Sequence, residues 1–223
     1  MKVVAISDTH YVSVLEKLNL PEAEILCHTG DFSMYGDPEE TLEFFHWLKS
    51  IANKFKAVFF LNGNHDFLLE SDPESFNELL TILPDNVKNL HNSGAEVDGV
   101  KFYGFPHVPA LPNWAFTKNR GEQMRKCTQT IPKCDVLLSH GPPYGILDEA
   151  WRPGWVDYGF NTERVGCQDL NDRVFEINPK LHIFGHIHED GNKKVKLGDT
   201  IFVNASILDR GYNLRNPPVV LEI

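Results

Sequence analysis

Residues 56–66 read KAVFFLNGNHD, an apolar run that passes directly into a polar turn. The run has the length and the aromatic and β-branched composition of a buried β-strand. A tight turn needs no more than an Asn-Gly pair, so the placement of Asn64, His65 and Asp66 side by side requires another explanation. The same arrangement recurs along the chain, and its recurrence predicts both the fold and the chemistry.

Seven apolar runs of this kind occur in the 223 residues, and their nearly continuous apolarity is typical of sheets covered on both faces. Residues 87–103 instead indicate short strands or hairpins, with turns at Gly94 and Gly99. The seven runs are KVVAIS (2–7), AEILCHT (23–29), KAVFFLN (56–62), CDVLLS (134–139), KLHIFG (180–185), TIFVNA (200–205) and PPVVLEI (217–223).

Helical patterns separate the early runs. Asp37 and Asp72 each precede a proline, which is the arrangement of an N-cap followed by the first helical residue. Residues 36–52 and 71–83 are therefore predicted helices, and a further helix is expected in residues 162–177. Strand–helix alternation followed by strand-rich segments predicts an α/β protein with two packed sheets and helices outside. Right-handed crossovers would bring the carboxyl ends of the strands to one edge, where such sheets bind ligands.

The composition favours one compact domain spanning residues 1–223, since no repeat or linker is visible. The formal charge of −10 argues against duplex nucleic acid as a partner, although a bound metal can reverse the local sign. The four cysteines show no CxxC pairing and predict neither a disulfide scaffold nor a zinc finger. No apolar run is long enough for a bilayer and the N-terminus lacks the features of a signal peptide, so a cytoplasmic protein without a membrane partner is expected.

Five of the runs end in polar clusters of closely related composition. Carboxylates, amides and imidazoles recur at the same topological position, so they would converge on one edge of the fold, as metal ligands do. One such cluster occurs often by chance, and an isolated histidine usually satisfies a core hydrogen bond, but five in order argue against coincidence. The clusters are Asp8-Thr9-His10, Gly30-Asp31, Gly63-Asn64-His65-Asp66, His140-Gly141-Pro142-Pro143 and Gly185-His186-Ile187-His188.

The set closely resembles the calcineurin-like metallophosphoesterases, whose pattern is DxH, GD, GNH[DE], a single His and GHxH. All five blocks are present between Asp8 and His188. The stretches SHGPPYGILD, FYGFP, and PNWAF followed by RG are similar to the small metallophosphoesterase-domain-containing proteins of that superfamily. The resemblance implies a four-layer α/β/β/α sandwich of two mixed sheets flanked by helices. One position departs from the pattern, because His107 stands where a Trp is expected after GxP.

By position, the resemblance assigns two metal ions to seven side chains, with Asp31 shared between the ions. Gly30 and Gly63 would let the backbone approach the ions closely. A mixed nitrogen and oxygen ligand set disfavours calcium and suits manganese, iron, zinc, cobalt or nickel, with manganese favoured. The ligands implied are Asp8, His10, Asp31 and His188 for the first ion, and Asp31, Asn64, His140 and His186 for the second.

The resemblance also explains residues 64–66. Two ions would clamp a phosphate and lower the pKa of a bridging water, and the resulting hydroxide would attack phosphorus in line. His65 would assist the leaving oxygen, and Asp66 would hold His65 in the correct tautomer. The alternative interpretation is that His65 and Asp66 cap the turn that follows.

Most of the remaining histidines have a simpler interpretation. His28 and His182 lie inside apolar runs and are expected to be buried and hydrogen-bonded, with a supporting role for His28 beside Asp31 as the alternative. His107 is a candidate substrate-binding residue, because the resemblance places it near the pocket. The stretch WRPGWVDYGF (151–160) is either a pocket wall that stacks on a base or a surface loop packed on its own aromatic residues.

The resemblance implies a dinuclear metal-dependent phosphoesterase that hydrolyses small phosphodiesters, with cyclic nucleotides among the candidate substrates. The motifs have no arginine cluster beside them, which favours diesters over dianionic monoesters. The alternatives are a phosphomonoesterase acting on nucleotides or phosphoproteins, and a catalytically weak scaffold of the same fold. The expected partner is a small phosphoester, and the sequence leaves the natural substrate, the metal and the oligomeric state open.

Overall fold

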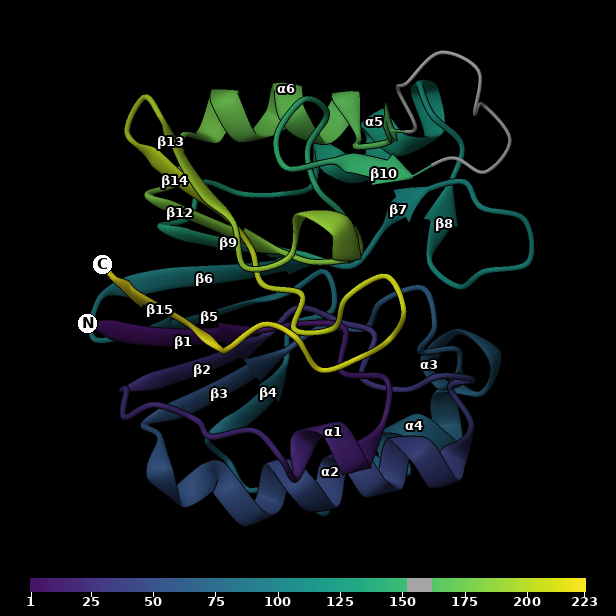
Figure 1. The fold of residues 1–223 in the computed structure, drawn as a ribbon, viewed down its shortest axis with the longest axis vertical. Helices are drawn as coiled ribbons and strands as arrows, with labels where there is room; N and C mark the ends of the chain where they lie inside the picture. The colour runs from purple at the N-terminus through teal and green to yellow at the C-terminus, as the bar shows by residue number, and fades with distance from the viewer. Residues whose placement is uncertain (152–161) are drawn as a thin grey trace.

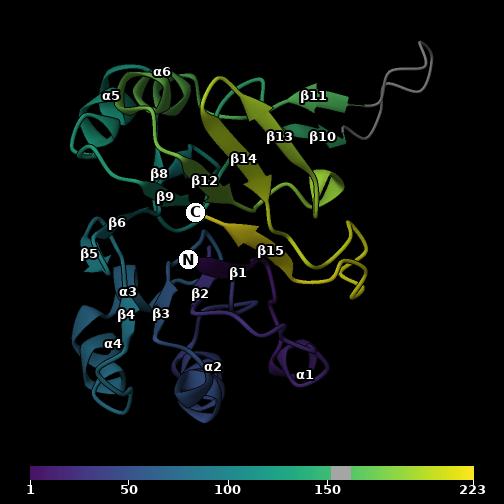
Figure 2. The same ribbon diagram turned by 90° about the vertical axis from the view of Figure 1, so that its left-hand side faces the viewer.

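The computed structural model describes residues 1–151 and 162–223, which form two large β-sheets packed face to face with helices on the outer sides (Figures 1 and 2). The first sheet has the order β15-β1-β2-β3-β4, and its strands are β1 Lys2–Ile6, β2 Ile25–His28, β3 Ala57–Phe60, β4 Val87–Asn89 and β15 Val219–Glu222. Strands β1 to β4 are parallel, and β15 pairs with β1 in the antiparallel sense.

The second sheet has the order β13-β14-β12-β9-β6-β5, and its strands are β5 Gly94–Val97, β6 Val100–Phe105, β9 Val136–Ser139, β12 Leu181–Phe184, β13 Lys194–Leu197 and β14 Thr200–Asn204. Its four central strands are parallel, and the two edge strands are antiparallel to their neighbours. Two short pairs lie outside the large sheets: β7 Val108–Pro109 with β8 Thr117–Lys118, and β10 Glu149–Trp151 with β11 Thr162–Arg164.

Helices cover both outer faces, so the predicted four-layer α/β/β/α sandwich is confirmed (Figure 2). Helices α1 Val12–Leu15, α2 Pro38–Ile51, α3 Leu68–Ser71 and α4 Pro73–Leu80 lie beside the first sheet, whereas α5 Glu122–Thr128 and α6 Gln168–Ile177 lie on the second. Two 3-10 turns complete the described elements, at Ala52–Lys54 and His188–Asp190. No helix in the described ranges combines the length and the apolar character needed to cross a membrane.

The predicted helix starts are confirmed at Asp37 and Asp72, whose side chains accept hydrogen bonds from the backbone N–H of Glu40 and Ser75, three residues further on. The helix predicted in residues 162–177 begins later than expected, at Gln168. The first residues of that range form strand β11, and Cys167 caps the helix. Gly94 opens strand β5 rather than forming a turn, whereas Gly99 lies in the predicted turn with a φ of +79°.

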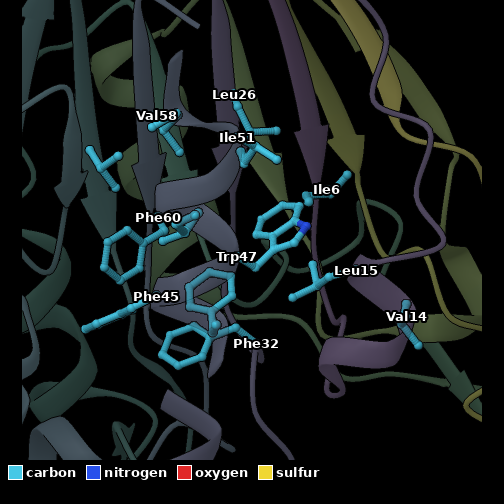
Figure 3. Packing of buried hydrophobic residues seen from close by; sticks show 14 of the residues in the cluster. Ile6, Val14, Leu15, Leu26, Phe32, Phe45, Trp47, Ile51, Val58 and Phe60 are labelled. Carbon is cyan, nitrogen blue, oxygen red and sulfur yellow. The ribbon is translucent and has the colours of Figure 1, made fainter. Parts of the chain in front are cut away.

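Aromatic packing anchors α2 to the first sheet. The ring of Phe45 on α2 lies 5.5 Å from that of Phe60 on β3 (Figure 3). It also lies 5.6 Å from the ring of Phe76 on α4. Phe60 ends the strand that leads into residues 61–66, so this contact fixes the position from which the polar turn starts. A second apolar cluster fills the space between the two sheets and fixes their spacing.

Replacing Phe45, which has no exposed surface, by Ala is expected to lower the free energy of unfolding by about 3–5 kcal/mol, because the transfer term and the cavity term add. Phe175→Ala, at a side chain that is 53% exposed, is the control and should cost less than about 1 kcal/mol. Urea unfolding of both variants checks this, and equal losses would contradict the role given to the aromatic cluster.

Candidate metal centre

The five predicted polar clusters meet where the carboxyl ends of the two sheets adjoin. Within each sheet, backbone hydrogen bonds join neighbouring turns: Asp8 N–H donates to Gly30 C=O at 3.0 Å, and Gly185 N–H donates to His140 C=O at 2.9 Å. A third link crosses between the sheets, because His140 Nδ1 hydrogen-bonds to Thr29 C=O at 2.9 Å. Side chains separated by up to 180 residues in sequence are therefore held in one place.

The predicted ligands form two groups whose nitrogen and oxygen atoms lie within 4.8 Å of one another. Asp31 Oδ2 faces both groups, because it lies 3.2 Å from His140 Nε2 and 4.0 Å from His10 Nε2. Asn64 Oδ1 joins the second group at 3.0 Å from His140 Nε2. The first group is Asp8, His10 and His188, and the second is Asp31, His140 and His186.

The unpartnered atoms of these groups fit cations. His10 Nε2 is buried without a hydrogen-bond partner among the described residues, and it faces a carboxylate oxygen of Asp31. His140 Nε2 faces the Asp31 carboxylate and the Asn64 amide oxygen, both of which only accept hydrogen bonds. The His10 lone pair has no protein partner, and His140 satisfies its two acceptor oxygens only by holding a second proton. The residues present therefore fit divalent cations with mixed nitrogen and oxygen ligands.

Backbone carbonyls orient three of the four ligating imidazoles. In each, Nδ1 donates its proton to a carbonyl oxygen, which leaves the Nε2 lone pair for a cation. The pairs are His10 with Ser33 (3.1 Å), His140 with Thr29 (2.9 Å) and His188 with Asp209 (3.0 Å).

The turns that carry the ligands have an unusual backbone. Asp8, His10, Asp31 and His186 all adopt the left-handed conformation, with φ between +51° and +69°. Non-glycine residues rarely adopt this conformation without a functional or structural reason. A Cβ at Gly63 would lie 2.2 Å from Asp31 Oδ1, so the room that this glycine leaves is filled by a predicted ligand.

The charges of the two carboxylates are stabilised by neighbouring imidazoles. Burial alone would lower the pKa of His140, but the Asp31 carboxylate raises it to about 9. Burial opposes protonation of His188 as well, and its contact with Asp8 raises the pKa to about 9. Burial lowers the pKa of His10 to about 4 and that of His186 to about 3. Cation binding would therefore displace protons from His140 and His188, because ligating imidazoles must be neutral.

The role predicted for Asp66 is wrong in one respect. Its carboxylate does not contact the His65 ring, whose Nδ1 hydrogen-bonds to Met34 C=O at 2.8 Å. Asp66 instead accepts the backbone N–H groups of Asp31 (2.9 Å) and Gly63 (2.7 Å), and both the N–H and the hydroxyl of Ser33. A carboxylate is the one common side chain group that accepts four donors. Asp66 therefore joins the turn that carries Asp31 to the turn that carries Asn64.

His65 lies beside the centre, as expected for a group that acts on a bound substrate. Its ring is 4.6 Å from that of His10, and one of its ring nitrogens lies within 4.8 Å of ligand atoms of His10 and Asp31. The backbone N–H of His65 donates to Asp31 Oδ1 at 2.9 Å. That bond leaves Asp31 Oδ2 as the oxygen shared by both groups.

His107 is not part of either group. Its Nδ1 hydrogen-bonds to Phe116 C=O at 3.3 Å, and its Nε2 to the Asn92 amide at 3.2 Å. Both ring nitrogens thus serve the packing of loops. Trp155, the second tryptophan of the predicted pocket wall, lies outside the described residues, whereas Trp151 ends strand β10.

His28 and His182 are buried and hydrogen-bonded, as expected, and both support the centre. His28 Nδ1 accepts from Gly30 N–H at 3.2 Å, and its Nε2 bonds to Thr9 Oγ1 at 3.0 Å. His28 therefore connects the turn of Asp8 and His10 with the turn of Asp31. His182 Nε2 bonds to Ser139 Oγ at 2.8 Å, directly before His140.

The loop between β14 and β15 contributes residues that sequence reasoning missed. Ser206 donates to Asp8 Oδ2 at 2.6 Å. The Tyr212 ring packs 5.0 Å from that of His10 and 5.2 Å from that of His188, so it shields two ligands. Strand β14 lies next to β12, so the rule that polar residues follow parallel strands would have singled out this loop too.

Two adjoining cavities open at the centre. The metal cavity, of about 260 Å³, is lined by Asp31, Asn64, His65, Leu111, Trp114, His186, His188, Glu189, Arg210 and Tyr212. The side cavity, of about 440 Å³, shares Leu111 and His186 with it and extends toward Trp151, Arg120 and Arg164. A ligand held at the centre thus has room for a substituent beyond His186.

Comparison with known proteins agrees with this geometry. The family described as calcineurin-like phosphoesterase matches residues 1–190. A human protein named metallophosphoesterase domain-containing protein 1 is 34% identical over 99% of this chain and 70% of its own length. A Nostoc protein named 3′,5′-cyclic-nucleotide phosphodiesterase is 24% identical over 81% of this chain and 62% of its own length. The fold is similar to that of a phosphopantetheinyl hydrolase from Mycobacterium tuberculosis, with a TM-score of 0.56 and 16% identity over 92% of this chain and 89% of that one.

Asp31→Asn should weaken both cations together, because the shared oxygen becomes a neutral amide. We expect metal content after dialysis, measured by elemental analysis, to fall for both ions, and the rise in Tm on adding Mn²⁺ to shrink with it. Asp199→Asn, in the exposed turn before β14, is the control and should retain both. Loss of one ion with full retention of the other would show that Asp31 is not shared.

His182 should make stability fall in acid. Burial lowers its pKa to about 3, whereas an unfolded chain titrates near the ordinary value of 6.5. Below that value the unfolded state binds a proton that the folded state excludes, so the free energy of unfolding falls by about 1.4 kcal/mol per pH unit for this group. His182→Gln should flatten the slope in urea titrations from pH 7 to pH 5, and the difference should approach that amount toward pH 5, where the unfolded state is almost fully protonated at this position. Equal slopes for wild type and His182→Gln would contradict the assignment.

Proposed function

This chain belongs to the calcineurin-like phosphoesterase family. We propose that it hydrolyses phosphodiesters with two bound divalent cations, and that both are Mn²⁺. Members of this family use a dinuclear divalent metal centre. One observation carries the proposal: Asp31 Oδ2 stands between two groups of nitrogen and oxygen ligands, each drawn from both sheets. When bound, such cations polarise a phosphoryl oxygen and lower the pKa of water.

The side chains divide the remaining work. Asp8, His10, Asp31 and His188 would hold one cation, and Asp31, Asn64, His140 and His186 the other. Asp66 and His28 would keep the turns that carry these ligands in register. Trp114 and Tyr212 line the metal cavity, and their rings would limit competing water.

His65 is proposed to move the proton. A water that has lost one proton to bulk solvent would attack phosphorus; a new P–O bond forms while the bond to the leaving oxygen breaks, and the leaving oxygen needs a proton. Because His65 Nδ1 already donates to Met34 C=O, the nitrogen that faces the cavity is Nε2. As an imidazolium, His65 can give the Nε2 proton to the leaving oxygen and remain bonded to Met34 as a neutral ring. Met34 C=O, rather than Asp66, therefore orients the His65 ring.

The side cavity supports a diester as substrate. A phosphodiester has a second substituent that stays on phosphorus, and the space beyond His186 and Leu111 can receive it. A monoester would leave this space to solvent. The relative named as a cyclic-nucleotide phosphodiesterase is consistent with this preference. The formal charge of −10 favours a small phosphoester over duplex nucleic acid.

A substrate panel tests the proposal. The protein loaded with Mn²⁺ should hydrolyse bis-p-nitrophenyl phosphate with a higher kcat/KM than p-nitrophenyl phosphate, and 2′,3′- and 3′,5′-cyclic nucleotides should be tested beside them. The reverse preference would favour a phosphomonoesterase. A protein that holds metal but turns over no phosphoester with manganese, iron, zinc, cobalt or nickel would instead be a scaffold.

His65→Ala should keep its metal and lose turnover. The loss expected for removing a general acid is about 100-fold to 10,000-fold in kcat with an activated diester as substrate. His46→Ala, at an exposed histidine on α2, is the matched control and should retain full activity. A collapse of metal content in His65→Ala would show that His65 is a ligand rather than a proton donor.

A further inference from the structure

Arg210 occupies an unusual place at the mouth of the centre. It belongs to the loop between β14 and β15, shown in yellow in Figure 1, and it lines the metal cavity together with His65, His188 and Tyr212. The motifs that follow the strands contain no arginine, so the sequence pattern gave no reason to expect a guanidinium there.

Within the part of the chain that the structure describes, the guanidinium of Arg210 has no acidic partner. Among residues 1–151 and 162–223 it forms neither an ion pair nor a hydrogen bond, although the protein is acidic. Other arginines are engaged, as the pairs of Arg120 with Val165 and Gly166, Arg125 with Asp169, Arg164 with Asp148 and Arg173 with Glu176 show. An arginine free of carboxylates retains its full capacity to bind an anion.

Trp151 holds Arg210 in place. Arg210 Cζ lies 3.5 Å from the centroid of the Trp151 ring, a cation–π contact. Trp151 is itself fixed, because its backbone N–H donates to Glu189 Oε1 at 3.0 Å and its strand pairs with β11. A stacked guanidinium has its face covered but keeps the N–H groups at its edge available. Trp151 lines the side cavity, so the pair stands at the junction of the two cavities.

The loop that carries Arg210 is tied to the metal ligands. Asp209 accepts His188 Nδ1 on its backbone oxygen at 3.0 Å. Its carboxylate accepts the backbone N–H groups of Gly211 and Asn213 at 2.8 and 3.0 Å. These bonds occupy the acidic group nearest to Arg210 in sequence, and they fix the loop relative to the centre.

We propose that Arg210, stacked on Trp151, binds a non-bridging phosphoryl oxygen of the substrate and thereby positions a singly charged phosphodiester with its retained substituent in the side cavity. The inference rests on the proposed function. One guanidinium matches the single negative charge of a diester, and its planar fork gives the phosphate a fixed orientation. Arg210 would act at binding, while His65 acts on the leaving oxygen from the same cavity.

Kinetics of Arg210 variants test the proposal in the metal-loaded protein. Arg210→Ala should lower kcat/KM for bis-p-nitrophenyl phosphate about 10-fold to 100-fold, mainly through KM, as expected for the loss of a charge-assisted hydrogen bond. Arg210→Lys should recover part of the loss, since it keeps the charge but not the fork. Arg215→Ala, which removes the same charge from the same exposed loop, should change kcat/KM less than about twofold.

Trp151 variants distinguish a positioned arginine from a merely nearby charge. Trp151→Ala should raise KM by less than Arg210→Ala, and the two effects should not add in the double variant, because Trp151 acts through Arg210. Additive effects, or an Arg210→Ala variant no worse than Arg215→Ala, would overturn the proposal.

A binding measurement separates this inference from the proposed function. Inorganic phosphate should bind the metal-loaded wild type at least about tenfold more tightly than Arg210→Ala by calorimetry, since the lost contact is a charge-assisted hydrogen bond. Equal affinities would overturn the role of Arg210 even if diesters are hydrolysed. Weaker phosphate binding by Arg210→Ala in a protein that hydrolyses no phosphoester would instead uphold Arg210 as an anion-binding residue and refute the hydrolase.

Discussion

The carboxylate of Asp31 is the contact on which the centre depends. One of its oxygens accepts the backbone N–H of His65, and the other faces imidazoles of both ligand groups. Because His140 comes from the second sheet and His10 from the first, the carboxylate also joins the two sheets. The sheets must therefore pack in one register, and the apolar cluster between them supplies that rigidity.

A shell of buried polar residues keeps Asp31 in position. Asp66 accepts four hydrogen bonds that unite the turns after β2 and β3, and His28 connects the turns after β1 and β2. These groups carry no reacting atoms. They hold left-handed turns that would be costly in isolation, so the strain of the ligand-bearing backbone is balanced by polar contacts.

The C-terminal loop adds what the ligand motifs lack. The motifs supply ligand atoms for metal ions, but none of them contains an arginine or lysine side chain that could bind a phosphate. Arg210 supplies such a side chain at the mouth of the metal cavity. Tyr212 from the same loop covers His10 and His188. A single loop thus shields the ligands and places a positive charge at the mouth of the cavity. Under the proposal for Arg210, substrate recognition would depend on the segment that leads into β15 of the first sheet.

The sequence by itself determined the layers of the fold and the seven side chains that meet at the centre. Buried parallel strands are nearly continuous apolar runs in the sequence. The polar residues that directly follow them lie at the edge of the sheet where the carboxyl ends of the strands meet. Tertiary structure decided the rest. The partner of His65 is Met34 rather than Asp66, and the two ring nitrogens of His107 bond to Asn92 and to Phe116 C=O. Arg210 reaches the mouth only because a loop folds across it. Such contacts depend on how loops from distant parts of the chain pack against one another, and a local sequence pattern does not specify that packing.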